Sequence, residues 1–159
     1  MPNFLEQLVS EWYEFRGYYV RRNVKVGKRT KGGHDGELDV VAFHPVERRL
    51  VHIEPSMDSD PWPKRELRYR KKFELGRQHI PALFAGFDAL PDLEQIAVLV
   101  YGAQTRSAPL GGGRIQMIGE LMQEVREGIA HRKIQSSAVP EQFVILRSLQ
   151  FAATYWRFA

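Results

Sequence analysis

Two carboxylates, Asp39 and Glu54, lie in short apolar runs that are typical of β-strands, residues 37–43 and 50–54. A turn over residues 47–49 joins the two runs, so a hairpin sets Asp39 beside Glu54. Magnesium binds oxygen ligands and commonly uses one or two carboxylates together with waters and substrate phosphates. The pair is therefore a candidate site for metal-dependent hydrolysis of a phosphodiester. The alternative is that both residues are solvated acids at strand ends.

Alternation of side chains along the hairpin decides which residues share a face of the sheet. It predicts that Leu38, Val40 and Ala42 point to one face and that Asp39 points to the other. A shared metal ion requires Asp39 and Glu54 to point the same way. Carboxylates on opposite faces of the sheet would exclude the site.

Periodic segments predict the elements that position this hairpin. The first is an amphipathic helix with Asn3 as its N-cap and Gly17 at its end. A strand and a basic, mobile loop then lead to the acidic hairpin. The predicted helices span residues 3–16, 63–77, 119–131 and 140–158, the further strands span 18–26, 95–101 and 114–118, and the loop spans 27–36.

The predicted elements follow the order amphipathic helix, three strands, basic helix and apolar strand, with Asp39 and Glu54 on the second and third strands. In this order the chain resembles the PD-(D/E)XK restriction-endonuclease-like superfamily, and within it the small archaeal Holliday-junction resolvases. The resemblance covers residues 4–101. It implies an α/β fold with a mixed central sheet flanked by helices. It also implies a Mg²⁺ or Mn²⁺ site built from Glu6 on the first helix, from Asp39 and Glu54, and from the carbonyl of Pro55.

Ser56 stands where the family motif has a lysine, in the sequence Ile53-Glu54-Pro55-Ser56. The motif lysine orients the attacking water and stabilises developing negative charge, and a neutral serine supplies no positive charge. Family members sometimes place the basic group elsewhere. Lys64, at the start of the next predicted helix, is the nearest candidate, ahead of the more distant Lys28, Lys31 and Lys71.

Length and composition fit one domain, with a nuclease-like core over residues 4–101 and a C-terminal extension over residues 102–159. The chain has 159 residues, of which 43% are hydrophobic and 26% charged. It has no cysteine, which excludes disulfides and thiolate zinc sites and favours a reducing cytoplasm. No apolar run is long enough to predict a membrane span or a secretory signal.

Basic residues gather in two segments whose charge exceeds the net charge of +4. Residues 21–31 hold six basic side chains and no acid, and residues 62–79 hold seven against two acids. Such clusters attract polyanions, and DNA is the expected partner, although solvated charged faces are the alternative. The predicted phosphate contacts are Lys25, Lys28, Arg29, Lys31, Arg65, Arg68, Lys71 and Lys72.

Three functions are compatible with these patterns. The first is a metal-dependent nuclease, and the second is a catalytically degenerate member of the fold that binds nucleic acid without cutting it. The third is a partner-binding module without a nucleic-acid role. The aromatic C-terminal helix, residues 140–158, either completes the core or forms a homodimer contact.

Overall fold

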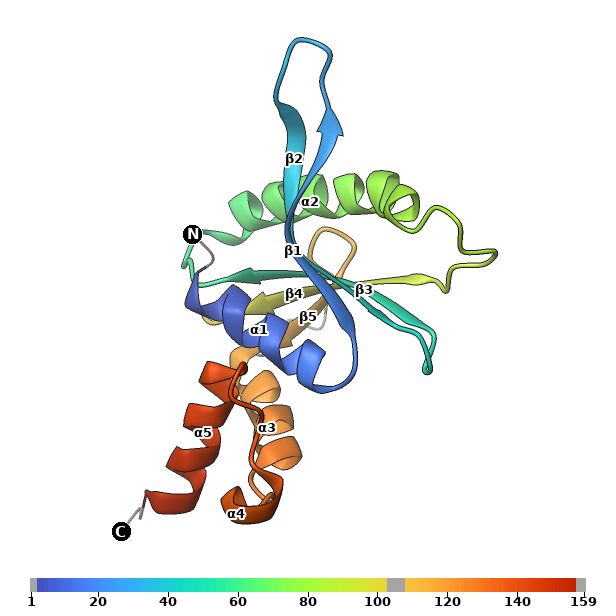
Figure 1. Cartoon of the computed structure of the whole chain (residues 1–159). Helices are drawn as coiled ribbons and strands as arrows, with labels where there is room; N and C mark the ends of the chain where they lie inside the picture. Colours follow the sequence, from blue (N-terminus) through green and yellow to red (C-terminus); the bar gives the residue numbers. More distant parts are fainter. Residues whose placement is uncertain (1–2, 103–107, 157–159) are drawn as a thin grey trace.

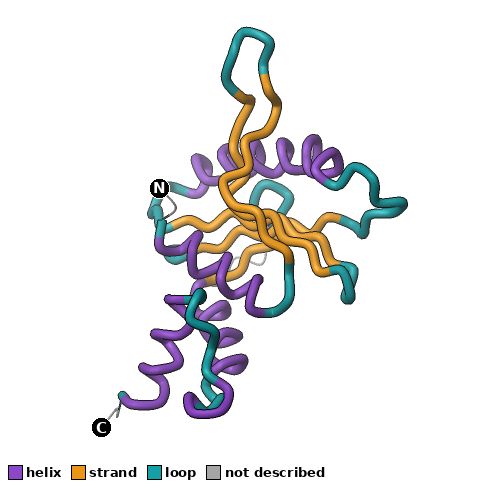
Figure 2. Tube along the Cα trace, in the orientation of Figure 1, coloured by secondary structure: helices purple, strands orange, loops and turns teal. Residues whose placement is uncertain are grey.

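The computed structural model describes residues 3–102 and 108–156 (Figures 1 and 2). In these parts of the chain, no helix has the length and apolar character needed to cross a membrane. The elements are α1 (Phe4–Phe15), β1 (Tyr19–Lys28), β2 (His34–His44), β3 (Arg49–Ser56), α2 (Trp62–Leu83), β4 (Leu93–Leu99), β5 (Arg114–Met117), α3 (Ile118–Ile129), α4 (Ile134–Ser137) and α5 (Val144–Tyr155).

The strands form a five-stranded mixed sheet in the order β1-β2-β3-β4-β5. Neighbours from β1 to β3 are antiparallel, as two short turns allow. The next two pairs, β3–β4 and β4–β5, are parallel. The helix α2 makes the crossover from β3 to β4 that a parallel pair requires. The predicted α/β class with a mixed sheet between helices is confirmed.

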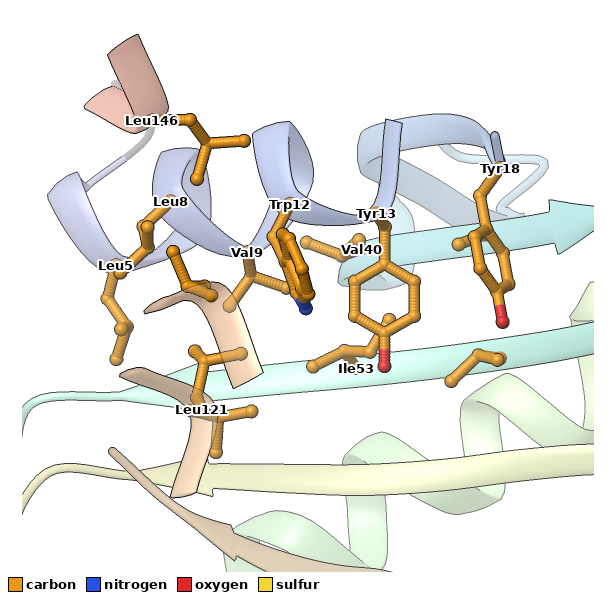
Figure 3. Packing of buried hydrophobic residues seen from close by; sticks show 14 of the residues in the cluster. Leu5, Leu8, Val9, Trp12, Tyr13, Tyr18, Val40, Ile53, Leu121 and Leu146 are labelled. Carbon is orange, nitrogen blue, oxygen red and sulfur yellow. The ribbon is translucent and has the colours of Figure 1, made fainter. Parts of the chain in front are cut away.

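Helices cover both faces of the sheet. One face packs against α1, α3 and α5, and the other packs against α2 (Figure 1). Asn3 caps α1 as predicted, since its side chain accepts a hydrogen bond from the Glu6 backbone N–H. The apolar stripe of α1 is buried on the sheet; Figure 3 shows Leu5, Leu8, Val9, Trp12 and Tyr13 facing Val40 and Ile53, with Leu121 and Leu146 beside them.

The C-terminal helix completes this core. Leu146 is fully buried, and the Glu11 carboxylate of α1 accepts the backbone N–H groups of Ile145 and Leu146. A carboxylate at a helix N-terminus satisfies unpaired donors and opposes the positive end of the helix dipole. The helix starts at Val144 rather than at residue 140, and residues 157–159 of the predicted span lie outside the described residues.

The hairpin of β1 and β2 projects beyond the sheet (Figure 2). Strand β2 pairs with β3 only from Val40 onward, whereas residues 34–38 pair with β1 alone. We call residues 24–38 the arm. The prediction of a mobile loop over residues 27–36 was wrong, because both strands extend into it and leave a turn of residues 29–33.

Simple alternation also fails at the base of the arm. Val40 and Ala42 belong to the cluster under α1, but Leu38 packs with Val41 on the α2 side. Asn23 and Asp39 are skipped in the pairing of β1 with β2, between the pairs Arg22–Val40 and Val24–Leu38. Asn23 has a φ of 51°, a left-handed conformation that asparagine tolerates better than most residues. This residue interrupts the regular strand and turns the arm relative to the sheet.

Gly76 allows α2 to approach the sheet closely. A Cβ atom at this position would lie 2.3 Å from His52 Nδ1 and 2.9 Å from Gln95 Nε2. Both of those side chains hydrogen-bond in the space beneath the helix, so they cannot move aside without losing partners.

We expect Gly76→Ala to lower the free energy of unfolding by about 1–3 kcal/mol, because overpacking a filled interface displaces side chains. Urea denaturation measures the effect. Gly119→Ala is the matched control: its added Cβ meets nothing within 4 Å, and alanine favours helix over glycine. Equal stability of the two variants would contradict this account of helix packing.

Candidate functional site

The two carboxylates meet where β2 separates from β3. Ile53 is the last β3 residue paired with β2, and one step further the Asp39 backbone N–H donates to Glu54 Oε1 at 3.1 Å. A carboxylate thus takes the place of the next ladder bond. The separation opens a cleft of about 370 Å³, lined by Asn3, Glu6, Asp39, Glu54, Pro55, Ser56, Met57, Asp58, Arg68, Tyr69 and Lys72.

Lys72 of α2 bridges the two carboxylates. Its Nζ lies 2.8 Å from Asp39 Oδ1 and 2.8 Å from Glu54 Oε2, so these two oxygens are at most twice that distance apart. The ammonium also donates to the Glu37 carbonyl at 2.9 Å. Asp39 and Glu54 therefore point to the same face of the sheet, as a shared cation requires. Sequence reasoning named Lys72 only as a phosphate contact.

Lys64 does not reach this site. Its Nζ bonds Asp60 Oδ1 at 2.9 Å, and its side chain is 69% exposed. Lys64, Arg68 and Lys72 follow one another at four-residue spacing, so they lie along one face of α2. The structure places the third of them, two turns further along the helix, over the carboxylates. The choice of Lys64 was wrong in position, and the four-residue spacing is a signal that makes Arg68 and Lys72 alternatives to it without selecting one of them.

Burial and mutual repulsion shape the charges in the cleft. The pKa of Asp39 is raised to about 7: burial is the largest cause, the nearby Glu54 carboxylate adds to it, and Lys72 opposes both. Burial acts to lower the pKa of Lys72, but the attraction of Glu54 and Asp39 outweighs it, and the pKa is raised. The ammonium stays charged, and one lysine does not fully compensate the two acids.

A buried hydrogen-bond relay holds Glu54 from below. Gln95 Nε2 donates to the Phe73 carbonyl and to His52 Nδ1, while Arg77 donates to Gln95 Oε1 at 2.7 Å and so fixes the amide orientation. His52 Nδ1 is then an acceptor, and its Nε2 carries the hydrogen that it donates to Glu54 Oε1 at 2.7 Å. Burial lowers the pKa of His52 to about 3, so the imidazole is neutral.

A second group of charges lies at the rim of the cleft, beside Ser56. The Ser56 hydroxyl donates to the Asp58 carboxylate, and the Arg68 guanidinium contacts Asp58, Asp60 and, at 3.4 Å, Ser56 Oγ. A guanidinium therefore lies close to Ser56, the position at which the resemblance leads one to expect a lysine. Its side chain is 37% exposed, which leaves it accessible from the cleft.

The other predicted metal-site residues are close to the pair without joining it. Glu6 lines the same cleft but accepts from the Asn3 side-chain amide at 2.6 Å. Within residues 3–102 and 108–156, no three histidine, aspartate or glutamate side chains converge on a metal position. Pro55 lies past the last residue of β3 that pairs with β2, so its missing N–H removes no bond to that strand.

The predicted phosphate contacts divide into exposed and structural residues. Lys25, Lys28, Lys31 and Lys71 are exposed, and Arg29, also exposed, pairs with Asp35. Arg65 was assigned wrongly. It is 3% exposed and donates to the carbonyls of Tyr101 and Asp58, so it ties α2 to the ends of two strands and does not face solvent.

Comparisons with known proteins do not assign the chain to a family. No protein-family profile matches it, and no curated protein matches it. The chain is similar to the crystal structure of AF1548, a protein of unknown function. The identity is 16% and the TM-score 0.48, over 93% of this chain and 76% of the other.

The raised pKa of Asp39 gives a direct test of the cleft. In Lys72→Met we expect the pKa of Asp39 to rise above about 7, because the stabilising cation is lost, and in Glu54→Gln we expect it to fall. A ¹³C NMR titration of the carboxyl carbon measures both shifts. Lys71→Met, at the exposed neighbouring position, is the control that should leave the pKa of Asp39 unchanged.

The raised pKa of Asp39 also determines how the contribution of this residue to the free energy of unfolding changes with pH. Between its ordinary pKa of 3.8 and the folded value of about 7, the folded state binds the Asp39 proton more tightly than the unfolded state does. The Asp39 contribution to stability is therefore full below that window and decreases as pH rises through it. Asp39→Asn should remove this decrease in urea denaturation series, and an unchanged pH dependence would contradict the assignment.

Proposed function

We propose that this chain is a metal-dependent nuclease of the PD-(D/E)XK class, with DNA as its substrate. One observation carries the proposal: Asp39, Glu54 and Lys72, from β2, β3 and α2, meet in one polar cleft. Two carboxylates and a lysine are the chemical groups of the motif whose third member is missing at Ser56. The lysine comes from the crossover helix instead of from the strand.

The donor set of the cleft fits a magnesium or manganese ion. Asp39 and Glu54 supply two carboxylates on one face, Pro55 lies beside them, and Mg²⁺ commonly takes waters and substrate phosphate oxygens as its remaining ligands. Burial and the nearby Glu54 carboxylate raise the pKa of Asp39 to about 7 although Lys72 opposes them, and a bound cation would favour the ionised form of Asp39 further. A bound divalent ion would supply Lewis-acid activation of water and of the phosphate.

The protein's own groups have separate tasks in this proposal. Lys72 uses its three N–H donors on Asp39, Glu54 and the Glu37 carbonyl. It therefore binds a water or a phosphate oxygen by exchanging one of these bonds, and its charge then stabilises the negative charge that develops in hydrolysis. The His52–Gln95 relay keeps the Glu54 carboxylate in place while Lys72 exchanges partners.

A non-catalytic nucleic-acid-binding protein of the same fold is the second candidate. The observation that favours it is that all three N–H donors of Lys72 already have partners within the protein. A fully bonded group of one lysine and two carboxylates is also a stable structural arrangement. Its exposed basic residues would still attract phosphates. The two candidates differ in whether divalent ions bind at Asp39 and whether strands are cut.

We expect Mg²⁺- or Mn²⁺-dependent cleavage of DNA that Asp39→Asn and Lys72→Met each reduce by about 10²-fold or more, since each removes a ligand or a charge from the reacting centre. Calorimetry should show that Asp39→Asn abolishes metal binding and that Lys72→Met retains it. Gel assays on linear, branched and single-stranded substrates measure the cleavage.

Lys64→Met is the matched control, because Lys64 belongs to the same helix face but lies outside the cleft. It should cut and bind metal like the wild type. Metal binding without cleavage of any of these substrates would favour the non-catalytic candidate. Absence of metal binding in the wild type would reject the centre at Asp39 and Glu54.

A further inference from the structure

The arm, residues 24–38, leaves the sheet at the cleft, because Asp39 is both its base and a member of the site. We propose that the arm enters the major groove of double-stranded DNA and contacts its phosphates while the cleft holds one phosphate of the same duplex. This inference rests on the proposed function and specifies the substrate as duplex rather than single-stranded.

The charge of the arm is not neutralised within the protein. Lys25, Lys28 and Lys31 are exposed along the arm. Lys25 lies across the hairpin from Glu37, but none of the three lysines forms a salt bridge with an acid among the residues that the structure describes. The two acids of the arm are engaged elsewhere, since Asp35 binds Arg29 and Glu37 accepts from the Asn23 amide. Exposed cations of this kind contribute to DNA affinity by displacing counterions from phosphates.

The arm is held in a fixed direction before any partner binds. Leu75 of α2 packs on Gly36, where an added Cβ would lie 2.5 Å from the leucine Cδ1. Val24, Val26 and Leu38 are buried at its base, and the turn is closed by the bond from the Arg29 N–H to the Gly33 carbonyl, 3.0 Å long. Binding therefore costs little ordering of the arm.

The reach of the arm fits a duplex. A strand advances about 3.3 Å per residue, so the turn at residues 29–33 lies roughly 20 Å from Asp39. The major groove of B-DNA is about 12 Å wide and admits a two-stranded β-ribbon. A rigid duplex presents phosphates at both places at once, whereas a single strand must be ordered to do so. The deep, narrow major groove of double-stranded RNA does not admit side chains.

The test compares the double variant Lys28→Gln, Lys31→Gln with the wild type in fluorescence anisotropy. Arg29 is kept because it holds Asp35. The ligands are a labelled DNA duplex, one of its single strands and the matching RNA duplex, across a range of salt concentrations, with chelator present to prevent cleavage. The matched control is Arg126→Gln, Lys133→Gln, which removes the same charge from exposed positions in α3 and just before α4. These two helices lie at the opposite end of the molecule from the arm (Figure 1).

We expect the arm variant to bind duplex DNA roughly tenfold or more weakly, and its salt dependence to lose about 0.9 log units of slope for each of the two lost contacts. Binding of the single strand and of duplex RNA should change little, and the control should match the wild type. Equal losses on all ligands, or no loss on duplex DNA, would overturn the arm proposal. Metal-dependent cleavage that still requires Asp39 would show that the proposed function survives such a result.

Discussion

The ammonium of Lys72 is the charge on which the centre of this structure depends. Asp39 and Glu54 are brought together in a buried cleft, and two carboxylates so placed repel each other and lose hydration. The lysine offsets both costs, and it joins α2 to β2 and β3 through three bonds. The offset is partial, because burial first and Glu54 second still raise the pKa of Asp39 to about 7. The divalent ion of the proposed function would act on the two carboxylates in the same direction as Lys72.

One local event, the separation of β2 from β3 at Asp39, produces both the cleft and the arm. Past this point the β2 residues pair with β1 alone, so the hairpin projects outward, and β3 is left with Glu54 and Pro55 on its freed edge. Pro55 could not donate to β2 there in any case, and the Glu54 carboxylate accepts the Asp39 N–H. The strands β2 and β3 lose a few ladder bonds beyond Ile53. The side chains of Asp39 and Glu54 line the cleft at the point where the two strands separate.

Sequence patterns predicted the strands, their succession along the chain and the meeting of Asp39 with Glu54, because alternation and short turns are local properties. They did not predict Lys72. Lys64, Arg68 and Lys72 share one helix face, and which of them stands over the carboxylates depends on the length and direction of the crossover and on Asp60, which binds Lys64. The arm was missed for a similar reason. Glycine and lysine in residues 27–36 carry no packing signal, and the contact of Gly36 with Leu75 joins residues far apart in the chain.

The C-terminal extension packs on the helix that forms one wall of the cleft, although none of the extension's described residues lines the cleft. Helix α1 places Glu6 in the cleft wall at its N-terminal end, and its Glu11 caps α5 one and a half turns later. The side chains of α3 and α5 bury the flank of α1 that the sheet leaves uncovered. The first turn of α1 carries the wall, and α1 is held both by the sheet and by the extension. Residues outside the resembled core therefore contribute to the packing that positions one side of the candidate site.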